Sequence, residues 1–234
     1  MKKSSTVLIY ILLSITAAFL LLILAISSNS NIRTIDIFDR FFVSVFFIIS
    51  CLIGISLTIH PGWIRKSIKG VFHSSTNNNL NKTSRKREGH HPNCDNFKNH
   101  TFRVKNKVYC TGCLGLAIGC IISIILIIFY NSFLVKISPE IFFYLIIIGM
   151  ILIGFVFIEI ISNKRNEFIH IISNSLFIIS FLIIIIGITE ITGNKIYGII
   201  GIILSFLWLD TRIQLSNWHH SKICSKCCNS CKMY

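Results

Sequence analysis

Three cysteines and three histidines occur in one short hydrophilic stretch, between His90 and Cys113. Along it the sequence reads His-His-Pro-Asn-Cys, five residues, His, nine residues, then Cys-Thr-Gly-Cys. Thiolate and imidazole are preferred ligands of zinc, which usually takes four in a tetrahedron. The Cys110-x2-Cys113 spacing suits chelation of one ion, and Cys94 and His100 precede it as two further donors. The pattern predicts a Cys3His zinc site, with the adjacent pair of histidines as spare donors.

A second group of thiols lies near the end of the sequence. Four cysteines fall within eight residues there: Cys224, Cys227, Cys228 and Cys231. They form an independent metal site, complete the first one, or belong to a disordered tail that binds adventitious metal. An iron–sulfur cluster is the alternative to zinc, because these clusters also use sets of cysteines. Spacing alone does not separate the two metals, so both remain open with zinc preferred.

The Cys110–Cys113 pair also has the spacing of a redox-active dithiol. Cys113 falls at the start of an apolar segment, where a helix dipole favours a thiolate. Under this alternative the protein is a membrane thiol oxidoreductase, with a tail cysteine as the exchange partner. The other two cysteines, Cys51 and Cys120, lie inside apolar segments and are expected to be inert packing residues.

The composition indicates a membrane protein. Of 234 residues, 53% are hydrophobic and 14% are charged, whereas a soluble domain has about 25% charged residues. A helix needs about 20 apolar residues to cross the hydrocarbon core. Six segments approach or exceed that length: 7–26, 41–59, 114–134, 141–161, 168–188 and 196–215. The sequence therefore predicts an all-α integral membrane protein with about six transmembrane helices and a small Cys/His loop module. We expect the first segment to be retained as a span rather than cleaved as a signal peptide.

The distribution of basic residues predicts the orientation. Six spans place residues 1–6, the loop 60–113, the turn 162–167 and the tail 216–234 on one side. With Arg212 counted in the tail, that side holds 19 of the 23 Lys and Arg residues. Such an excess marks the cytoplasmic side. We expect a multi-pass protein of the cell membrane with both termini in the cytoplasm.

The loop 60–113 divides into two parts. Residues 60–88 form a basic linker that suits anionic lipid headgroups, and we expect no nucleic acid partner. Further along, Thr101–Lys105 and Val108–Cys110 flank a turn at Asn106-Lys107, which predicts a short hairpin. A cytoplasmic protein is the remaining partner that such a module would recruit.

Some polar residues fall inside the predicted spans. Glu159 and His170 flank a short turn, so we expect their helices to be antiparallel neighbours with Asn174 one turn deeper than His170. Such a group relays protons or supports a nearby metal ligand through hydrogen bonds; alternatively, both residues sit in water at the interface. Asp210 and Arg212 are expected to lie on different faces and to anchor the end of the sixth span.

Two glycines at the start of the third span, in Gly115-x3-Gly119, favour close packing of helices over a merely flexible helix start.

The motif resembles that of an uncharacterised family of small, mainly archaeal, multi-pass membrane proteins. The shared pattern is similar to His-His-Pro-x-Cys-x2-Phe-x2-His followed by Cys-x-Gly-Cys-x-Gly-Leu at the start of a span. The matching residues are His90, His91, Pro92, Cys94, Phe97, His100, Cys110, Gly112, Cys113, Gly115 and Leu116. The resemblance covers roughly 30 residues and implies a multi-pass protein with a motif-bearing cytoplasmic loop. It implies no activity and no catalytic residue.

The function that follows is a structural one. A zinc ion would fold a loop that is too small to build its own core, and the loop would then recruit a partner or regulate it. No nucleotide-binding loop, serine-hydrolase elbow or HExxH motif is present, so we assign no catalytic residue. A metal-ion transporter is the third alternative, with Glu159, His170 and Asn174 as its few intramembrane ligands.

Overall fold

The structure, a computed structural model, describes residues 2–28, 35–59, 87–88, 91–92, 101–104, 107–132, 138–162 and 166–224. Those residues are mostly helical. The helices are α1 (Lys2–Ser28), α2 (Ile37–Ile59), α4 (Thr111–Ser132), α5 (Pro139–Ile161), α6 (Glu167–Thr192) and α7 (Lys195–Cys224). The strands are β1 (Arg87–Glu88), β2 (His91–Pro92), β3 (Thr101–Val104) and β4 (Lys107–Cys110). They form two antiparallel pairs, β1–β2 and β3–β4.

All six helices are long and apolar enough to cross a membrane. Their apolar stretches contain between 22 and 29 residues. At about 1.5 Å per residue even the shortest exceeds the ~30 Å of a hydrocarbon core. Large apolar side chains also cover the outside of the bundle, for example Ile151 and Ile158, which are 65% and 70% exposed. The fold is therefore consistent with a multi-pass membrane protein surrounded by lipid.

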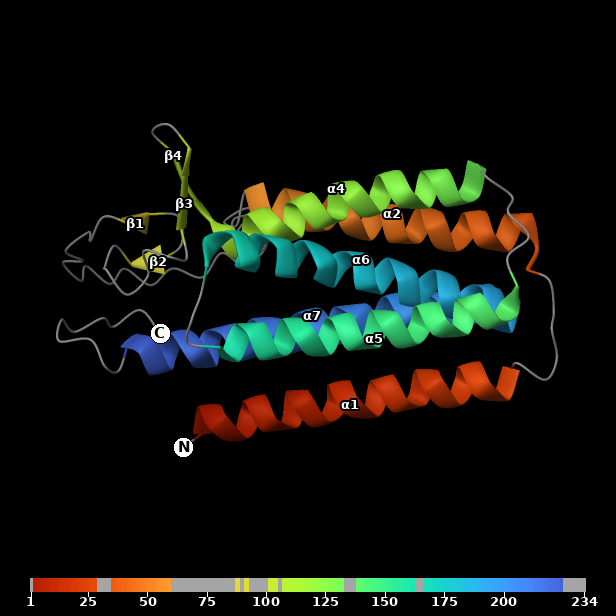
Figure 1. The fold of residues 1–234 in the computed structure, drawn as a ribbon, viewed down its shortest axis with the longest axis horizontal. Coiled ribbons are helices and arrows are strands. Elements are labelled where there is room, and N and C mark those ends of the chain that lie inside the picture. The colour runs from red at the N-terminus through yellow and green to blue at the C-terminus, as the bar shows by residue number, and fades with distance from the viewer. Residues whose placement is uncertain are drawn as a thin grey trace, which may run out of the picture.

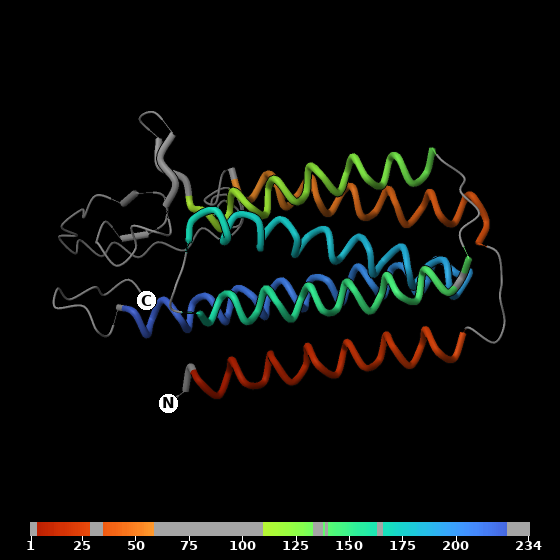
Figure 2. Tube along the Cα trace, in the orientation of Figure 1, coloured from red at the N-terminus to blue at the C-terminus, as the bar shows by residue number. Residues whose placement is uncertain are grey.

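The helices form a bundle with α6 at its centre (Figure 1). Helix α6 packs most extensively against α4 and α5, and also contacts α7 and α1. Buried residues occur around its whole circumference, as expected for a helix enclosed by others. Helix α1 lies at one edge and packs mainly on α7, while α2 packs on α4 and α7. Figure 2 shows that α1 begins and α7 ends at the same end of the bundle.

We call this the motif end: α4 and α6 begin there, and α5 and α7 end there (Figure 1). Cys113 lies in the first turn of α4 and Cys224 is the last residue of α7, so the backbones of both residues lie at the motif end.

Close approach of α4 to α6 depends on the two glycines of the predicted packing motif. A Cβ on Gly115 would lie 2.5 Å from the Ile171 carbonyl oxygen, and one on Gly119 would lie 2.7 Å from that of Ser175. The hydroxyl of Ser175 donates a hydrogen bond of 2.9 Å to the Gly115 carbonyl. The packing interpretation is confirmed, and the contact fixes the start of α4 against α6.

The connections between α5 and α6 and between α6 and α7 are short. Asn166 accepts a hydrogen bond from the Phe168 amide and caps the start of α6. Gly193, with φ of 58°, ends α6 in the left-handed conformation that glycine adopts readily. Helix α7 follows almost at once and continues to Cys224, well beyond the predicted limit at residue 215. A helix therefore covers the predicted sixth span, and it extends further than that span.

The predicted hairpin is confirmed, except that Lys107 belongs to the second strand rather than to the turn. In its register, Thr101 pairs with Cys110 and Val104 pairs with Lys107. Strand β4 runs directly into α4, so Cys110 is the last residue of a strand and Thr111 the first of a helix. The hairpin thus delivers the chain to the motif end at a defined residue.

Candidate functional site

The two thiols of the Cys110-x2-Cys113 motif lie together where β4 meets α4. Both side chains are half-buried, and the Cys113 thiol is within hydrogen-bonding range of the Cys110 thiol. Cys113 occupies the first turn of α4, where the unpaired amides and the helix dipole favour negative charge. We call this pair the dithiol.

Beside it, the end of α5 and the start of α6 carry a buried histidine–carboxylate pair. The His170 Nδ1 atom lies 3.0 and 3.1 Å from the two carboxylate oxygens of Glu159. The two residues are only 6% and 9% exposed. The predicted meeting of Glu159 with His170 is confirmed, and the alternative in which both sit in water is wrong. With Nδ1 held by the carboxylate, Nε2 is the nitrogen that can face other groups.

Arg212 of α7 is a third buried polar residue at this end of the bundle. It is 8% exposed, and its Nε donates a hydrogen bond of 2.6 Å to the Asn174 side-chain oxygen. We predicted that Arg212 and Asp210 would anchor a helix end, and that prediction is wrong. Because α7 continues for about three more turns, both residues lie within the helix, Arg212 facing α6 and Asp210 bonding Tyr10 of α1. As predicted, the side chains of Asp210 and Arg212 lie on different faces of the helix.

Gly112 is the point at which these groups converge. A Cβ on Gly112 would lie 2.9 Å from Arg212 Nη2, 3.3 Å from His170 Nε2 and 3.8 Å from Cys110 Sγ. The guanidinium is also close enough to Cys113, Cys110 and Glu159 to interact favourably with the negative charge of each. The motif glycine therefore allows a cation and an imidazole to approach the turn between the two thiols. The cation favours the thiolate form, which binds metals and attacks disulfides, whereas burial and the contact between the two thiols oppose it.

The remaining predicted ligands fall largely outside the described residues. This holds for Cys94 and His100, for Cys227, Cys228 and Cys231, and for the side chain of Cys224, whose backbone ends α7. Among the side chains that the structure does describe, no group of three or more His, Cys, Asp or Glu is arranged to hold a metal ion. The dithiol is thus the part of the predicted metal site that the structure brings together.

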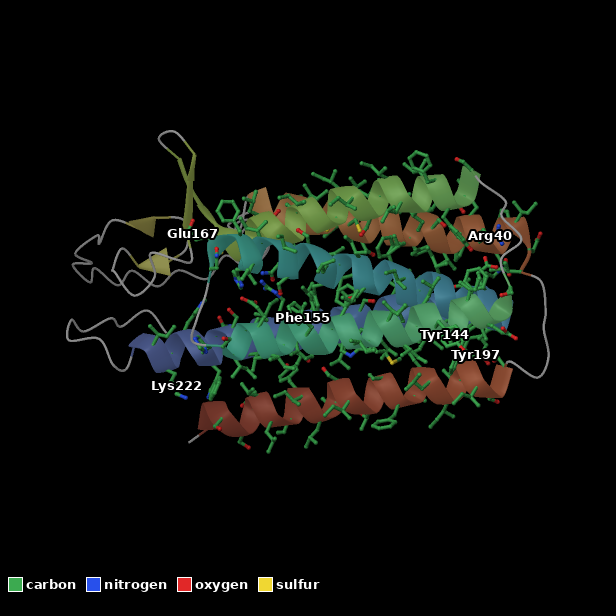
Figure 3. The ribbon with its side chains drawn as sticks, in the orientation of Figure 1. Arg40, Tyr144, Phe155, Glu167, Tyr197 and Lys222 are labelled. Atoms are coloured by element: carbon green, nitrogen blue, oxygen red, sulfur yellow. The ribbon has the colours of Figure 1, made fainter. Side chains whose placement is uncertain are left out.

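A second charge cluster, which is partly buried and which the sequence analysis missed, lies at the opposite end of the bundle. Arg40 of α2 forms an ion pair of 2.8 Å with Glu190 of α6, and the Tyr130 hydroxyl of α4 donates a hydrogen bond to the same carboxylate. The Arg40 guanidinium lies 5.2 Å from the centre of the Tyr130 ring. Figure 3 shows Arg40 at this end and Glu167 and Lys222 at the motif end. The available signal was Glu190, an acidic residue two positions beyond the fifth predicted span at 168–188.

Cys51 and Cys120 were expected to be packing residues, and both are buried, at 4% and 5% exposed. They are not isolated, because their thiols lie within hydrogen-bonding range across the α2–α4 contact. None of the four cysteines whose side chains are described forms a disulfide. The bundle therefore holds two thiol pairs, at different depths along α4.

Comparison with known proteins adds no assignment: no family model, curated protein or solved structure matches the chain.

Proposed function

We propose that this chain is a multi-pass protein of the cell membrane that binds a structural zinc ion on its cytoplasmic face. Cys94, His100, Cys110 and Cys113 are the ligands, and the tail cysteines form a second site or add to the first. The zinc folds the loop between α2 and α4, which then presents a surface to a cytoplasmic protein. The basic linker before it contacts anionic lipid headgroups.

One observation carries the proposal, namely the position of the dithiol in the hairpin. Cys110 lies opposite Thr101 in the register, and directly opposed residues in an antiparallel pair have Cα atoms about 4.5–5.5 Å apart. His100 directly precedes Thr101 in the sequence, so this proposed ligand is one residue away from the position that faces Cys110. Two thiols within contact range and an imidazole next to the facing strand are the donor types and spacing that suit zinc. The return of α7 to the motif end supports a contribution from the tail.

A second candidate function, thiol–disulfide exchange, is favoured by the surroundings of Gly112. Arg212 and the His170–Glu159 pair are the kind of groups that activate a cysteine nucleophile. The Cys110 thiolate would attack a substrate disulfide, form a mixed disulfide and release one substrate thiolate. Cys113 would then attack the Cys110 sulfur and release the second substrate thiol. The substrate is reduced by two electrons and the dithiol is oxidised to a disulfide.

A metal-ion transporter has less support, because Glu159 and Asn174 are engaged by His170 and Arg212. A buried guanidinium among the few intramembrane donors also opposes the passage of metal cations.

Metal analysis combined with thiol labelling tests the proposal. The purified protein is expected to hold about one or two zinc ions per chain and to be colourless. Its thiols should resist alkylation until a chelator is added. Cys110→Ser and Cys113→Ser should each lose zinc, whereas the matched variants Cys51→Ser and Cys120→Ser should retain it. A metal-free preparation whose dithiol alkylates without chelator would favour thiol exchange, and a brown iron-containing one would replace zinc by an iron–sulfur cluster.

A further inference from the structure

Arg212 is a buried cation in a membrane bundle, and such a residue needs a compensating partner. Removing an ion of this kind from water is costly unless opposite charge or hydrogen bonds surround it. Its Nε is satisfied by Asn174, which leaves the remainder of the guanidinium to interact elsewhere. The question is which negative charge it balances.

Asn174 fixes the direction of the guanidinium. The Asn174 side-chain nitrogen donates to the His170 carbonyl oxygen of the same helix. Its side-chain oxygen is thereby turned toward α7, where it accepts from Arg212. Because both the nitrogen and the oxygen of the side-chain amide are hydrogen-bonded, Asn174 holds a fixed orientation between α6 and α7, and we call it the bracket. The bracket directs Nη2 to Gly112, between the two thiols of the dithiol.

The other acidic group nearby is already paired. Both carboxylate oxygens of Glu159 lie within hydrogen-bonding distance of His170, and the Ser173 hydroxyl lies 3.4 Å from one of them. Arg212 is also close enough to interact with Glu159, but its Nη2 lies beside Gly112, between the two thiols in the sequence. The negative charge that remains for Arg212 is therefore that of the two sulfurs.

We propose that Arg212 is a positioning residue and the counter-charge of the metal-bound dithiol. This inference rests on the proposed function. A zinc ion held by three thiolates and one neutral imidazole carries one net negative charge, and a single guanidinium neutralises it. Arginine suits the role better than lysine because its planar group bonds Asn174 at Nε and still presents Nη2 to the motif turn. Arg212 thus links metal binding in the loop to the packing of α6 against α7.

The test is zinc affinity of the full-length protein in detergent, measured by competition with a chromophoric chelator. Arg212→Gln removes the charge and should weaken zinc binding by about 10- to 100-fold, the usual effect of losing a group that supports metal ligands. Arg212→Lys restores the charge and should recover part of the affinity. Arg40→Gln removes another largely buried guanidinium at the opposite end of the bundle and should leave the affinity unchanged.

A second variant guards against a folding defect in Arg212→Gln. Asn174→Asp keeps the size of the side chain, although it loses the hydrogen bond to the His170 carbonyl. It gives Arg212 a carboxylate of its own, so zinc binding should weaken although Arg212 is present. Wild-type affinity in both Arg212→Gln and Asn174→Asp, with zinc still lost in Cys110→Ser, would overturn the role of Arg212 and leave the zinc site intact. Unchanged zinc content in Cys110→Ser and Cys113→Ser would overturn the zinc site and this inference together.

Discussion

At the scale of single residues, Glu159, Arg212 and Arg40 are charged groups inside the apolar bundle, and a partner from another helix meets each of them. Glu159 and His170 were foreseeable, because a short turn between two spans brings their helix ends together. Arg212 was misjudged because a sequence of apolar residues ending in charges resembles the end of a span. Its partner Asn174 is 38 residues away in the chain, and no local pattern records such a contact.

The ion pair at the opposite end gives a prediction at this scale. Glu190→Ala should lower the free energy of unfolding by about 3 kcal/mol, the lower end of the range for a buried pair, because Arg40 loses its partner. The double variant Arg40→Met with Glu190→Leu should recover most of this loss, since no charge is then left unpaired. Stability is measured by unfolding in detergent.

The neighbouring pair of Lys195 with Asp39, at 2.8 Å, is the control for that experiment. The Lys195 side chain is 40% exposed, and pairs in contact with solvent contribute only about 0–1 kcal/mol. Lys195→Met should therefore have little effect. A loss in Glu190→Ala no larger than in Lys195→Met would contradict the assignment of a stabilising role to the buried pair.

At the scale of helices and strands, much of the fold follows from local sequence. Runs of about 20 apolar residues give the spans, and the alternation before Cys110 gives the hairpin. The sixth helix was the exception, because Asp210 interrupts its hydropathy while the helix itself continues. A hydrophobic run measures how much of a helix lipid can surround. It does not measure where a helix ends when its polar residues are bonded to neighbours.

The contact between α4 and α6 can be tested with two glycine substitutions. Gly115→Ala places a Cβ 2.5 Å from the Ile171 carbonyl oxygen, so the helices must separate and stability should fall by about 1–3 kcal/mol. Gly154→Ala in α5 meets nothing within 4 Å and should be neutral or stabilising by up to about 1 kcal/mol, because alanine favours the helix. Equal effects of the two substitutions on unfolding would show that α4 and α6 are not closely packed.

At the scale of the whole molecule, the backbones of Cys110, Cys113 and Cys224 lie at one end of the bundle. The sequence assigns most of the Lys and Arg residues outside the spans to the same side, which predicts that this side faces the cytoplasm. The candidate site could be only partly foreseen: the dithiol and its His170–Glu159 neighbour follow from spacing, whereas the approach of Arg212 to Gly112 depends on how α4, α6 and α7 pack together.

Topology reporters check this orientation. Green fluorescent protein fused after Tyr234 should fluoresce, because it folds in the cytoplasm, whereas alkaline phosphatase fused there should be inactive. Alkaline phosphatase inserted at the α6–α7 turn, between Gly193 and Asn194, should show the reverse and be active outside. An active phosphatase at the C-terminus would place the dithiol outside the reducing compartment and would argue against free thiolates as metal ligands.

Helix α7 runs unbroken from Arg212 to Cys224. The orientation of Cys224 is therefore fixed relative to Arg212. Each residue advances a helix by about 1.5 Å and rotates it by about 100°. One residue inserted between Ile213 and Asn217 would keep the hydrogen bond between Arg212 and Asn174. It would rotate the end of α7 about the helix axis by about 100°. Seven inserted residues would nearly restore its direction and lift it by about 10 Å. The helical repeat of α7 thus sets the position and direction in which the backbone leaves the bundle at Cys224.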